Sequence, residues 1–164
     1  MEKQVHTISI YVTNKPGVLV RISTIFSRRG FNIESLVVSP ALDGRYSRMT
    51  ITSVGDPKVL DQIIKQVQKL VDVLQASEHL PAETIEKEFA LLKIKVDSKN
   101  RIEVLQLVQH FKAEAIDFTD ESIIIQICAS TAKLDNFIKL LDPYGIIELV
   151  RTGKVIMARG AKET

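Results

Sequence analysis

The sequence predicts an α+β protein made of two tandem ferredoxin-like βαββαβ units. Strand-like alternation and helical spacing follow one another in the order βαββαβ over the first half of the chain, and the same order returns in the second half. A short segment around Leu80-Pro81-Ala82 separates the halves and indicates a linker. The 164 residues suffice for one large or two small domains. The repeat favours two, which we place at residues 1–79 and 80–164.

The chain opens with a strand and a helix. Residues 4–12 alternate between apolar and polar side chains, which indicates a half-buried strand. After the turn Asn14–Gly17, helical spacing appears in the apolar residues Val18, Leu19, Ile22, Ile25 and Phe26. Arg28 and Arg29 suit the last turn of this helix, and Gly30 suits the position just past it.

The rest of the first half supplies three strands and a second helix. The predicted strands are residues 31–39, 45–54 and 71–78. The pair Asp43-Gly44 marks a turn between the first two of them. Asp56 is expected to cap a helix that begins at Pro57 and buries the stripe Leu60, Ile63, Ile64 and Val67.

The second half repeats this order with different residues. We predict a strand at 87–96, a helix at 100–112, strands at 114–119 and 122–129, a helix at 131–142 and a strand at 145–151. A further short strand at 154–158 is compatible with the pattern.

Composition and charge exclude several classes of protein. The net charge of +2 gives no electrostatic argument for binding nucleic acid. Ferredoxin-like sheets that bind RNA use aromatic residues on their central strands, and we expect no such pair in a chain with no tryptophan, 3 tyrosines and 6 phenylalanines. No apolar stretch approaches the roughly 18 residues that span a membrane. We therefore expect neither a nucleic acid nor a membrane as a partner.

Cysteine use and the first residues point to the cytoplasm. Cys128 is the single cysteine and cannot form a disulfide within the chain, which favours a reducing compartment. The first residues lead straight into a strand-like run, and we recognise no signal peptide.

The sequence shows no set of residues suited to catalysis. His6, His79 and His110 are scattered without metal-ligand spacing, and we expect ordinary surface or half-buried histidines and no bound metal. Cys128 lies inside an apolar strand, where a small core residue is the expected role. Glycine-rich phosphate loops and nucleophile turns are absent.

The turn Asn14-Lys15-Pro16-Gly17 is the best candidate for a binding site. Proline suits a helix start, where its missing N–H would be unpaired in any case. The next backbone amides point outward without a helical partner, and Gly17 has no side chain to cover them. A carboxylate can rest against such amides, aided by the helix dipole. The alternative, an ordinary capped helix start, stays open on local chemistry alone.

A resemblance to a known family bears on this choice. Residues 14–38, NKPGVLVRISTIFSRRGFNIESLVV, closely resemble the opening of ACT domains, which are small-molecule regulatory modules with βαββαβ topology. The stretches GRYSRMTITSVGD (44–56) and QVQKLVDVLQASE (66–78) are similar to the small, regulatory subunits of acetohydroxyacid synthase, also called acetolactate synthase. The second half resembles the C-terminal domain of that family, with LLKIKV and AIDFT as its nearest matches.

The resemblance implies a non-catalytic subunit with a large partner. In that family the catalytic subunit carries thiamine diphosphate, Mg and FAD, and it condenses two pyruvates, or pyruvate with 2-oxobutyrate, in branched-chain amino-acid synthesis. The small subunit carries no cofactor, activates its partner and confers feedback inhibition, commonly by valine. Its implied contact surface for the partner includes Arg45, Arg48 and Met49.

The resemblance also implies an effector site in the first unit. Its residues here would be Asn14, Pro16, Gly17, Val18, Leu19, Asn32 and Ile33. Val20 stands where the family often has a smaller residue, which leaves its effect on the pocket open. The matching place in the second half reads Asp97–Asn100, so no effector site is expected there.

The expected sheet order separates these residues into two groups. Asn14 and Gly17 follow the first strand, whereas Asn32 begins the second, which runs parallel to the first with the third between them. A strand of about eight residues therefore places the groups roughly 25 Å apart. If two copies join antiparallel along their second strands, which are sheet edges, the turn of one meets Asn32 of the other. We therefore expect a homodimer formed through the ACT domains.

Two other functions stay open at this stage. The chain could be a free-standing amino-acid sensor that acts on a different enzyme or on a transcription factor. It could also be an enzyme in its own right, but the missing acid, base, nucleophile and metal ligands argue against that.

Overall fold

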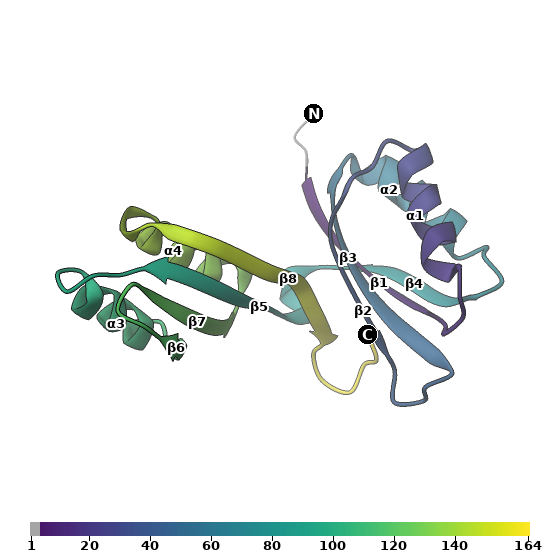
Figure 1. The fold of residues 1–164 in the computed structure, drawn as a ribbon. Helices are drawn as coiled ribbons and strands as arrows, with labels where there is room; N and C mark the ends of the chain where they lie inside the picture. The colour runs from purple at the N-terminus through teal and green to yellow at the C-terminus, as the bar shows by residue number, and fades with distance from the viewer. Residues whose placement is uncertain (1–3) are drawn as a thin grey trace. The chain divides into compact units, whose positions relative to one another are not determined.

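The computed structural model describes residues 4–164 and contains two four-stranded antiparallel sheets with helices (Figure 1). The first sheet has the order β2-β3-β1-β4, built from β1 (Gln4–Thr13), β2 (Ile33–Pro40), β3 (Tyr46–Gly55) and β4 (Val73–His79). The second has the order β6-β7-β5-β8, built from β5 (Thr84–Lys95), β6 (Glu114–Phe118), β7 (Ser122–Ala129) and β8 (Ile146–Ala158). The predicted fold, two tandem βαββαβ units, is confirmed.

In the first unit, α1 (Val18–Arg28) and α2 (Pro57–Val67) lie on the same face of the sheet (Figure 1). Alternation along β1 directs Ile8, Ile10 and Val12 to that face, and all three are buried. Asp56 caps α2 as predicted, because its side chain accepts a hydrogen bond of 2.8 Å from the amide of Lys58.

The second unit packs α3 (Arg101–His110) and α4 (Thr131–Leu141) against its own core. In the sequence between β4 and β5, the predicted linker is a short 3-10 turn, Pro81–Glu83, and a second such turn, Asp142–Tyr144, precedes β8. β8 is one continuous strand, so the expected separation of 145–151 from 154–158 is wrong. Gly153 interrupts the apolar pattern, but the strand continues through it with φ +85°.

The two compact units do not follow the sequence order strictly. Residues up to Glu86 form the first unit together with Gly153–Thr164, and Lys87–Thr152 form the second. The last twelve residues therefore group with the first half. The division at 79/80 stays a prediction about sequence domains.

The face of the first sheet that turns away from its helices is polar but covered. Its buried polar residues are Thr7, Ser9, Thr50, Thr52 and His79. A cavity on this face is lined by strand residues together with residues 157–164, so the C-terminal residues of the same unit lie against it. The C-terminal segment thus covers part of the sheet face that the two helices leave uncovered.

Several expectations for single residues are wrong. Cys128 is exposed, because alternation along β7 buries Ile123, Ile125 and Ile127 and turns Cys128 to the opposite face. His6 and His79 are buried, whereas surface or half-buried histidines were expected. The ring of His6 lies 2.6 Å from Oε1 of Glu78 through Nδ1, and the sequence spacing gives no sign of that contact.

An aromatic pair does exist on the two central strands, contrary to expectation. Tyr11 on β1 and Tyr46 on β3 have ring centroids 5.4 Å apart. Tyr11 lies opposite Arg48 in the register, which makes Tyr46 its diagonal neighbour across 35 residues of sequence. The guanidinium carbons of Arg48 and Arg45 lie over the rings of Tyr11 and Tyr46, 5.7 and 5.6 Å from the ring centroids. The pair is therefore engaged within the chain, and the absence of a nucleic-acid partner stays a prediction.

Candidate functional site: the cleft at the start of α1

Asn14 ties the predicted turn to the neighbouring hairpin. Its backbone amide donates to the carbonyl of Arg45 at 2.7 Å, and its side-chain Nδ2 donates to the carbonyl of Gly44 at 3.0 Å. Within residues 4–164, no group donates a hydrogen bond to Oδ1 of Asn14. The side chain therefore has a fixed orientation and a spare acceptor.

Gly17 is the N-cap of α1, with φ +84° and ψ −10°. The helix begins at Val18, so Pro16 precedes the cap and does not open the helix, which corrects the expectation for that residue. The left-handed conformation of Gly17 already turns the chain, which leaves Pro16 outside the first helical turn. Gly17 offers no side chain to cap the helix, and none of residues 4–164 accepts a hydrogen bond from the amides of Val18, Leu19 or Val20. This helix start has the bare donors that an anion needs.

A cleft of about 180 Å³ opens beside these amides. Its lining comes from the end of β1, the turn, the first helical residues and the β2–β3 hairpin: Val12, Thr13, Asn14, Lys15, Gly17, Val18, Leu19, Val38, Ser47 and Met49. Polar groups gather at the turn, and aliphatic side chains form the walls. Drug-sized ligands occupy pockets of roughly 300–1,000 Å³, so this smaller cleft suits a molecule the size of an amino acid.

An ion pair between Arg21 and Asp72 lies beside the turn. Arg21 donates through Nη2 to a carboxylate oxygen of Asp72, whose other oxygen accepts a hydrogen bond of 2.9 Å from Oγ1 of Thr13. The hydrogen bond from Thr13 and the Arg21 guanidinium hold the pKa of the Asp72 carboxyl below its ordinary value. The turn therefore has two cations near it, Arg21 and Lys15, and one carboxylate, that of Asp72.

Asn32 and Ile33 lie at the other end of the same sheet. Thr13 pairs with Tyr46 on β3, whereas Ile33 pairs with Ser53, seven residues further along that strand. At about 3.4 Å per residue this is roughly 24 Å. The predicted separation of the two groups is confirmed. One chain therefore does not bring Asn32 and Ile33 to the cleft.

The structure places several residues differently from the expectations for the site. Leu19 and Val18 line the cleft, but Val20 does not and is 66% exposed. Met49 is 3% exposed and lies in the core, so it cannot belong to a surface for the catalytic partner. Alternation explains this, because Met49 faces the helices while Arg48 faces away from them.

The sequence did contain a signal for the missed wall residues. The turn Asp43-Gly44 lies midway between Val38 and Met49, and these two residues are indeed paired in the register. A hairpin centred on that turn therefore predicts Val38 opposite Met49. What it does not predict is that the start of α1 closes the cleft over them.

The turn before α3, the equivalent helix of the second unit, holds a carboxylate of the chain itself. Oδ1 of Asp97 accepts hydrogen bonds of 2.8 Å from the amide of Lys99 and 3.0 Å from that of Asn100. These backbone bonds, from Asn100 and then Lys99, lower the pKa of Asp97. The second unit thus has an acidic side chain in the turn where the first unit has Gly17, and the absence of an effector site there stays a prediction.

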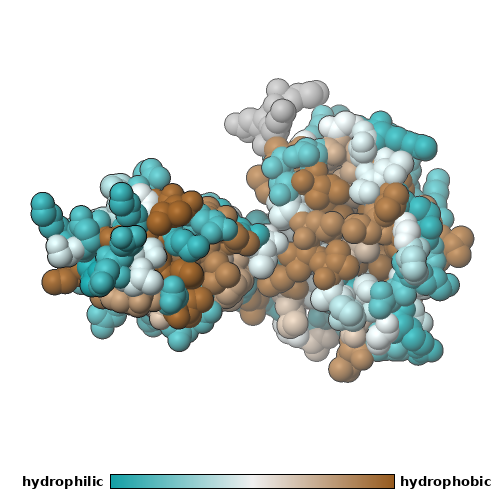
Figure 2. Space-filling model, viewed as in Figure 1, coloured by the Kyte–Doolittle hydropathy of each residue, from teal (hydrophilic) through white to brown (hydrophobic). Residues whose placement is uncertain are grey.

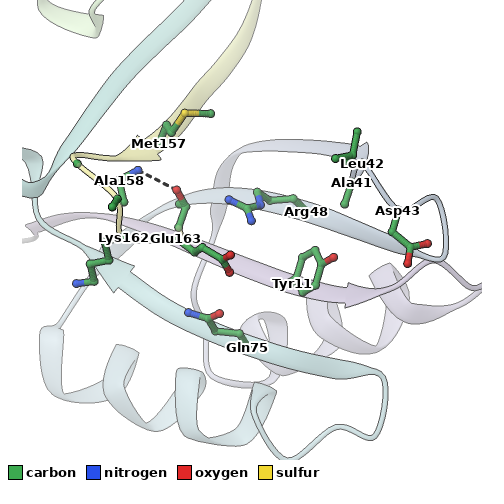
Figure 3. A pocket seen from close by; sticks show the side chains of 13 residues that line it. Tyr11, Ala41, Leu42, Asp43, Arg48, Gln75, Met157, Ala158, Lys162 and Glu163 are labelled. Carbon is green, nitrogen blue, oxygen red and sulfur yellow. Dashed lines mark hydrogen bonds between the residues drawn. The ribbon is translucent and has the colours of Figure 1, made fainter.

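A larger cavity, of about 540 Å³, lies on the opposite face of the first sheet (Figure 3). Tyr11, Arg48 and Gln75 project into it from the strands, and Lys162 and Glu163 border it from the C-terminal segment. The amide of Ala158 donates to Oγ1 of Thr164 at 2.8 Å, which holds this segment in a turn. Charges of both signs and an open mouth give this cavity no defined ligand chemistry.

Two further features are absent from the described part of the chain. Over residues 4–164, no helix is long and apolar enough to cross a membrane. The same residues include no cluster of His, Cys, Asp and Glu side chains placed to hold a metal ion.

Comparison with known proteins matches both units to one family. The model "AHAS small subunit-like ACT domain" matches residues 8–75, and the model "Small subunit of acetolactate synthase" matches residues 87–160.

Similar proteins match over nearly the whole length. A probable acetolactate synthase small subunit of Archaeoglobus fulgidus is 44% identical over 158 residues, which cover 96% of this chain and 99% of that protein. The acetolactate synthase small subunit of Mycobacterium bovis is 38% identical over 162 residues, 99% of this chain and 96% of that one. The crystal structure of the small subunit from Thermotoga maritima aligns with a TM-score of 0.86 at 39% identity, covering 96% of this chain and 98% of that one.

Proposed function

This chain belongs to the family of acetolactate synthase small subunits, and from that premise we propose that it confers feedback inhibition by binding valine, or another branched-chain amino acid, in the cleft at the start of α1. As a small subunit with an ACT domain it has a regulatory role beside a catalytic large subunit. We propose further that it activates this partner, and that thiamine diphosphate, Mg and FAD reside in the partner.

The proposal rests on one observation: the cleft has, at one end, backbone amides without an acceptor among the described residues, and apolar side chains along its walls. The amides of Val18 and Leu19 suit the α-carboxylate of an amino acid, helped by the dipole of α1. Oδ1 of Asn14 is a spare acceptor suited to the α-ammonium group. The aliphatic walls, with Val38 and Met49 among them, favour a branched apolar side chain over a polar one.

A second copy of the chain would complete the site. β2 is an edge of its sheet, and hydrophobic residues gather over the strands of the first unit in the view of Figure 2. We propose that two copies join antiparallel along β2, so that the turn at Gly17 faces Asn32 and Ile33 of the other copy. Effector binding then favours one dimer geometry over others, and that linkage supplies the regulation.

Reconstitution with the catalytic large subunit tests the proposal. The purified chain alone should make no acetolactate from pyruvate, and its addition should raise the rate of the large subunit. Valine, leucine and isoleucine are then titrated, and at least one should inhibit. A chain that raises no rate and binds none of the three would contradict the proposal. A chain that binds one of them but leaves the large subunit unaffected would instead be a free-standing sensor.

Dimer formation is measured separately by sedimentation with and without valine. The variant Val37→Lys, on the edge strand β2, should weaken association, because it brings two like charges together across the paired edges. A matched change on the other edge strand, Leu74→Lys on β4, should leave it unchanged.

A further inference from the structure

Arg21 holds its guanidinium directly over Gly17. A Cβ atom built on Gly17 would lie 3.2 Å from Nη1 of Arg21. Nη2 of the same group donates to the Asp72 carboxylate. Among residues 4–164, no acceptor is bonded to Nη1 or Nε of Arg21. The guanidinium therefore has, among the described residues, unused donors on the side that faces Gly17, which itself lines the cleft.

Asp72 fixes that orientation from the other side. Its backbone carbonyl accepts a hydrogen bond of 2.8 Å from the amide of Thr13, and its carboxylate accepts one of 2.9 Å from the Thr13 hydroxyl. Thr13 itself lines the cleft. Asp72 is thus anchored to the end of β1 by two bonds, and its remaining oxygen holds Arg21. This arrangement holds the Arg21 guanidinium beside the turn. Among the described residues, its Nη1 and Nε keep N–H donors without an acceptor.

Resting on the proposed function, we propose that Arg21 selects effectors with a free carboxylate, and that Asp72 is the positioning residue that aims it. A carboxylate has two oxygens, and a helix N-terminus and a guanidinium are both strong donors to it. One oxygen binds the amides after Gly17, and the other faces Nη1 of Arg21. The ligand class is then amino acids with an unmodified carboxylate. Their amides and esters, which lack the charge, are excluded.

Calorimetry on the full chain tests this with L-valine and L-valinamide, which differ only in the carboxylate. Hydrogen bonds between charged groups are worth enough to shift affinity about ten- to hundredfold. Arg21→Met should weaken valine binding by about that factor and change valinamide binding less than about twofold. Arg21→Lys keeps the charge but loses the planar fork, and should fall between wild type and Arg21→Met.

The matched control is Arg28→Met, which removes an exposed arginine from the last turn of the same helix. It should leave both affinities unchanged. Asp72→Asn should weaken valine binding less than Arg21→Met does, because the cation remains but is no longer held. A melting curve of each variant shows whether it folds. If Arg21→Met does not fold, the valine and valinamide affinities of Arg21→Lys are compared with wild type instead.

The inference is overturned if Arg21→Met, or Arg21→Lys in its place, weakens valine and valinamide equally, or if valine binds these variants as tightly as wild type. It is also overturned if wild type binds both molecules equally well. Failure of the proposed function gives a different result, because the wild-type chain would then bind none of valine, leucine and isoleucine.

Discussion

Val38 lies directly opposite Met49 across the β2–β3 hairpin, and both line the cleft at the start of α1. Met49 is 3% exposed and also belongs to the core of the first unit, whereas Val38 is 43% exposed on the edge strand. Met49 is therefore held in place by the core, whereas the side chain of Val38 can be replaced without disturbing the core. A change at Val38 alters the size of the cleft with little effect on folding, whereas a change at Met49 disturbs both.

The first prediction follows from that difference. Val38→Phe adds an aromatic ring to a cleft of about 180 Å³, and the lost space should weaken valine binding at least tenfold. The free energy of unfolding should change by no more than about 0.5 kcal/mol, as for most surface substitutions. Calorimetry and a denaturant titration measure the two quantities. Val155→Phe, at a position with 44% exposure on β8, is the control and should leave valine binding unchanged. Normal valine binding by Val38→Phe would place the effector elsewhere.

The second prediction concerns Gly17→Asp. Its side chain would occupy the space beside Arg21 and set a negative charge where the effector carboxylate rests. Two like charges about 4 Å apart repel by roughly 4 kcal/mol at an effective dielectric constant of 20. Solvent screening lowers this, so we expect a loss of valine affinity of about ten- to hundredfold. The reconstituted enzyme should still be activated but should no longer respond to valine.

Backbone strain is the competing explanation for any effect of Gly17→Asp, and a second glycine controls for it. Gly30 also has a left-handed φ, +69° against +84°, and a Cβ there meets nothing within 4 Å. Gly30→Asp should lower the melting temperature to a similar degree but leave valine inhibition intact. If Gly17→Asp retains wild-type inhibition, the cleft is not the effector site. If it loses activation as well, the turn serves the partner interface instead.

The secondary structure was largely predictable, because most of it follows from short-range patterns. The alternation Ile8, Ile10 and Val12 and the cap at Asp56 each depend on a few neighbouring residues, and both are confirmed. Expectations failed where contacts between residues far apart in the sequence determine burial or domain membership. The alternation of β7 is apolar on both faces, so only the packed structure shows that Cys128 is left outside. Likewise, nothing near Gly153 indicates that residues 153–164 return to the first unit.

The site was predictable in part for the same reason. Asn14 and Gly17 belong to one short turn whose chemistry is local, and both line the cleft. Arg21 reaches the turn from one helical turn away, but its aim depends on Asp72, which comes from a loop 51 residues later in the sequence. Such a contact leaves no periodic signal. It is visible only once the end of β1 and the start of β4 are side by side.

The third prediction is that each chain binds one effector molecule. The turn before α3 already holds the carboxylate of Asp97, which accepts hydrogen bonds from the amides of Lys99 and Asn100. Asp97→Ala removes these hydrogen bonds and should therefore lower the free energy of unfolding by about 1 kcal/mol, without altering valine binding. Calorimetry should give one site per chain before and after the change. A second site in wild type that survives Gly17→Asp would show that the start of α3, or another place, binds the effector too.

The last prediction concerns His79, which lies beneath the C-terminal segment. Its Nε2 is 2.6 Å from Oγ of Ser9 and 3.2 Å from Oγ of Ser77. Burial, and then the positive charge of Lys162, lowers the pKa of His79 from its ordinary value of 6.5, with Arg48 acting in the same direction and Glu83 against it. The unfolded chain therefore binds a proton at His79 more readily than the folded chain does. Stability is then constant with respect to this group above pH 6.5 and falls as the pH drops below it.

Denaturant titrations of the full chain at pH 7.5 and pH 5.5 measure that loss. One proton taken up on unfolding contributes at most about 1.4 kcal/mol per pH unit. His79→Gln should reduce the difference between the two pH values, because glutamine keeps a polar side chain near Ser9 but does not titrate. His110→Gln is the control, since His110 is exposed in the last turn of α3, and it should leave the difference unchanged.

Asp43, Asp72 and Asp97 have lowered pKa values and should stay ionised throughout this range. If His79→Gln and wild type lose equal stability between the two pH values, the proton is taken up elsewhere. In that case His79 does not sense pH beneath the terminal segment.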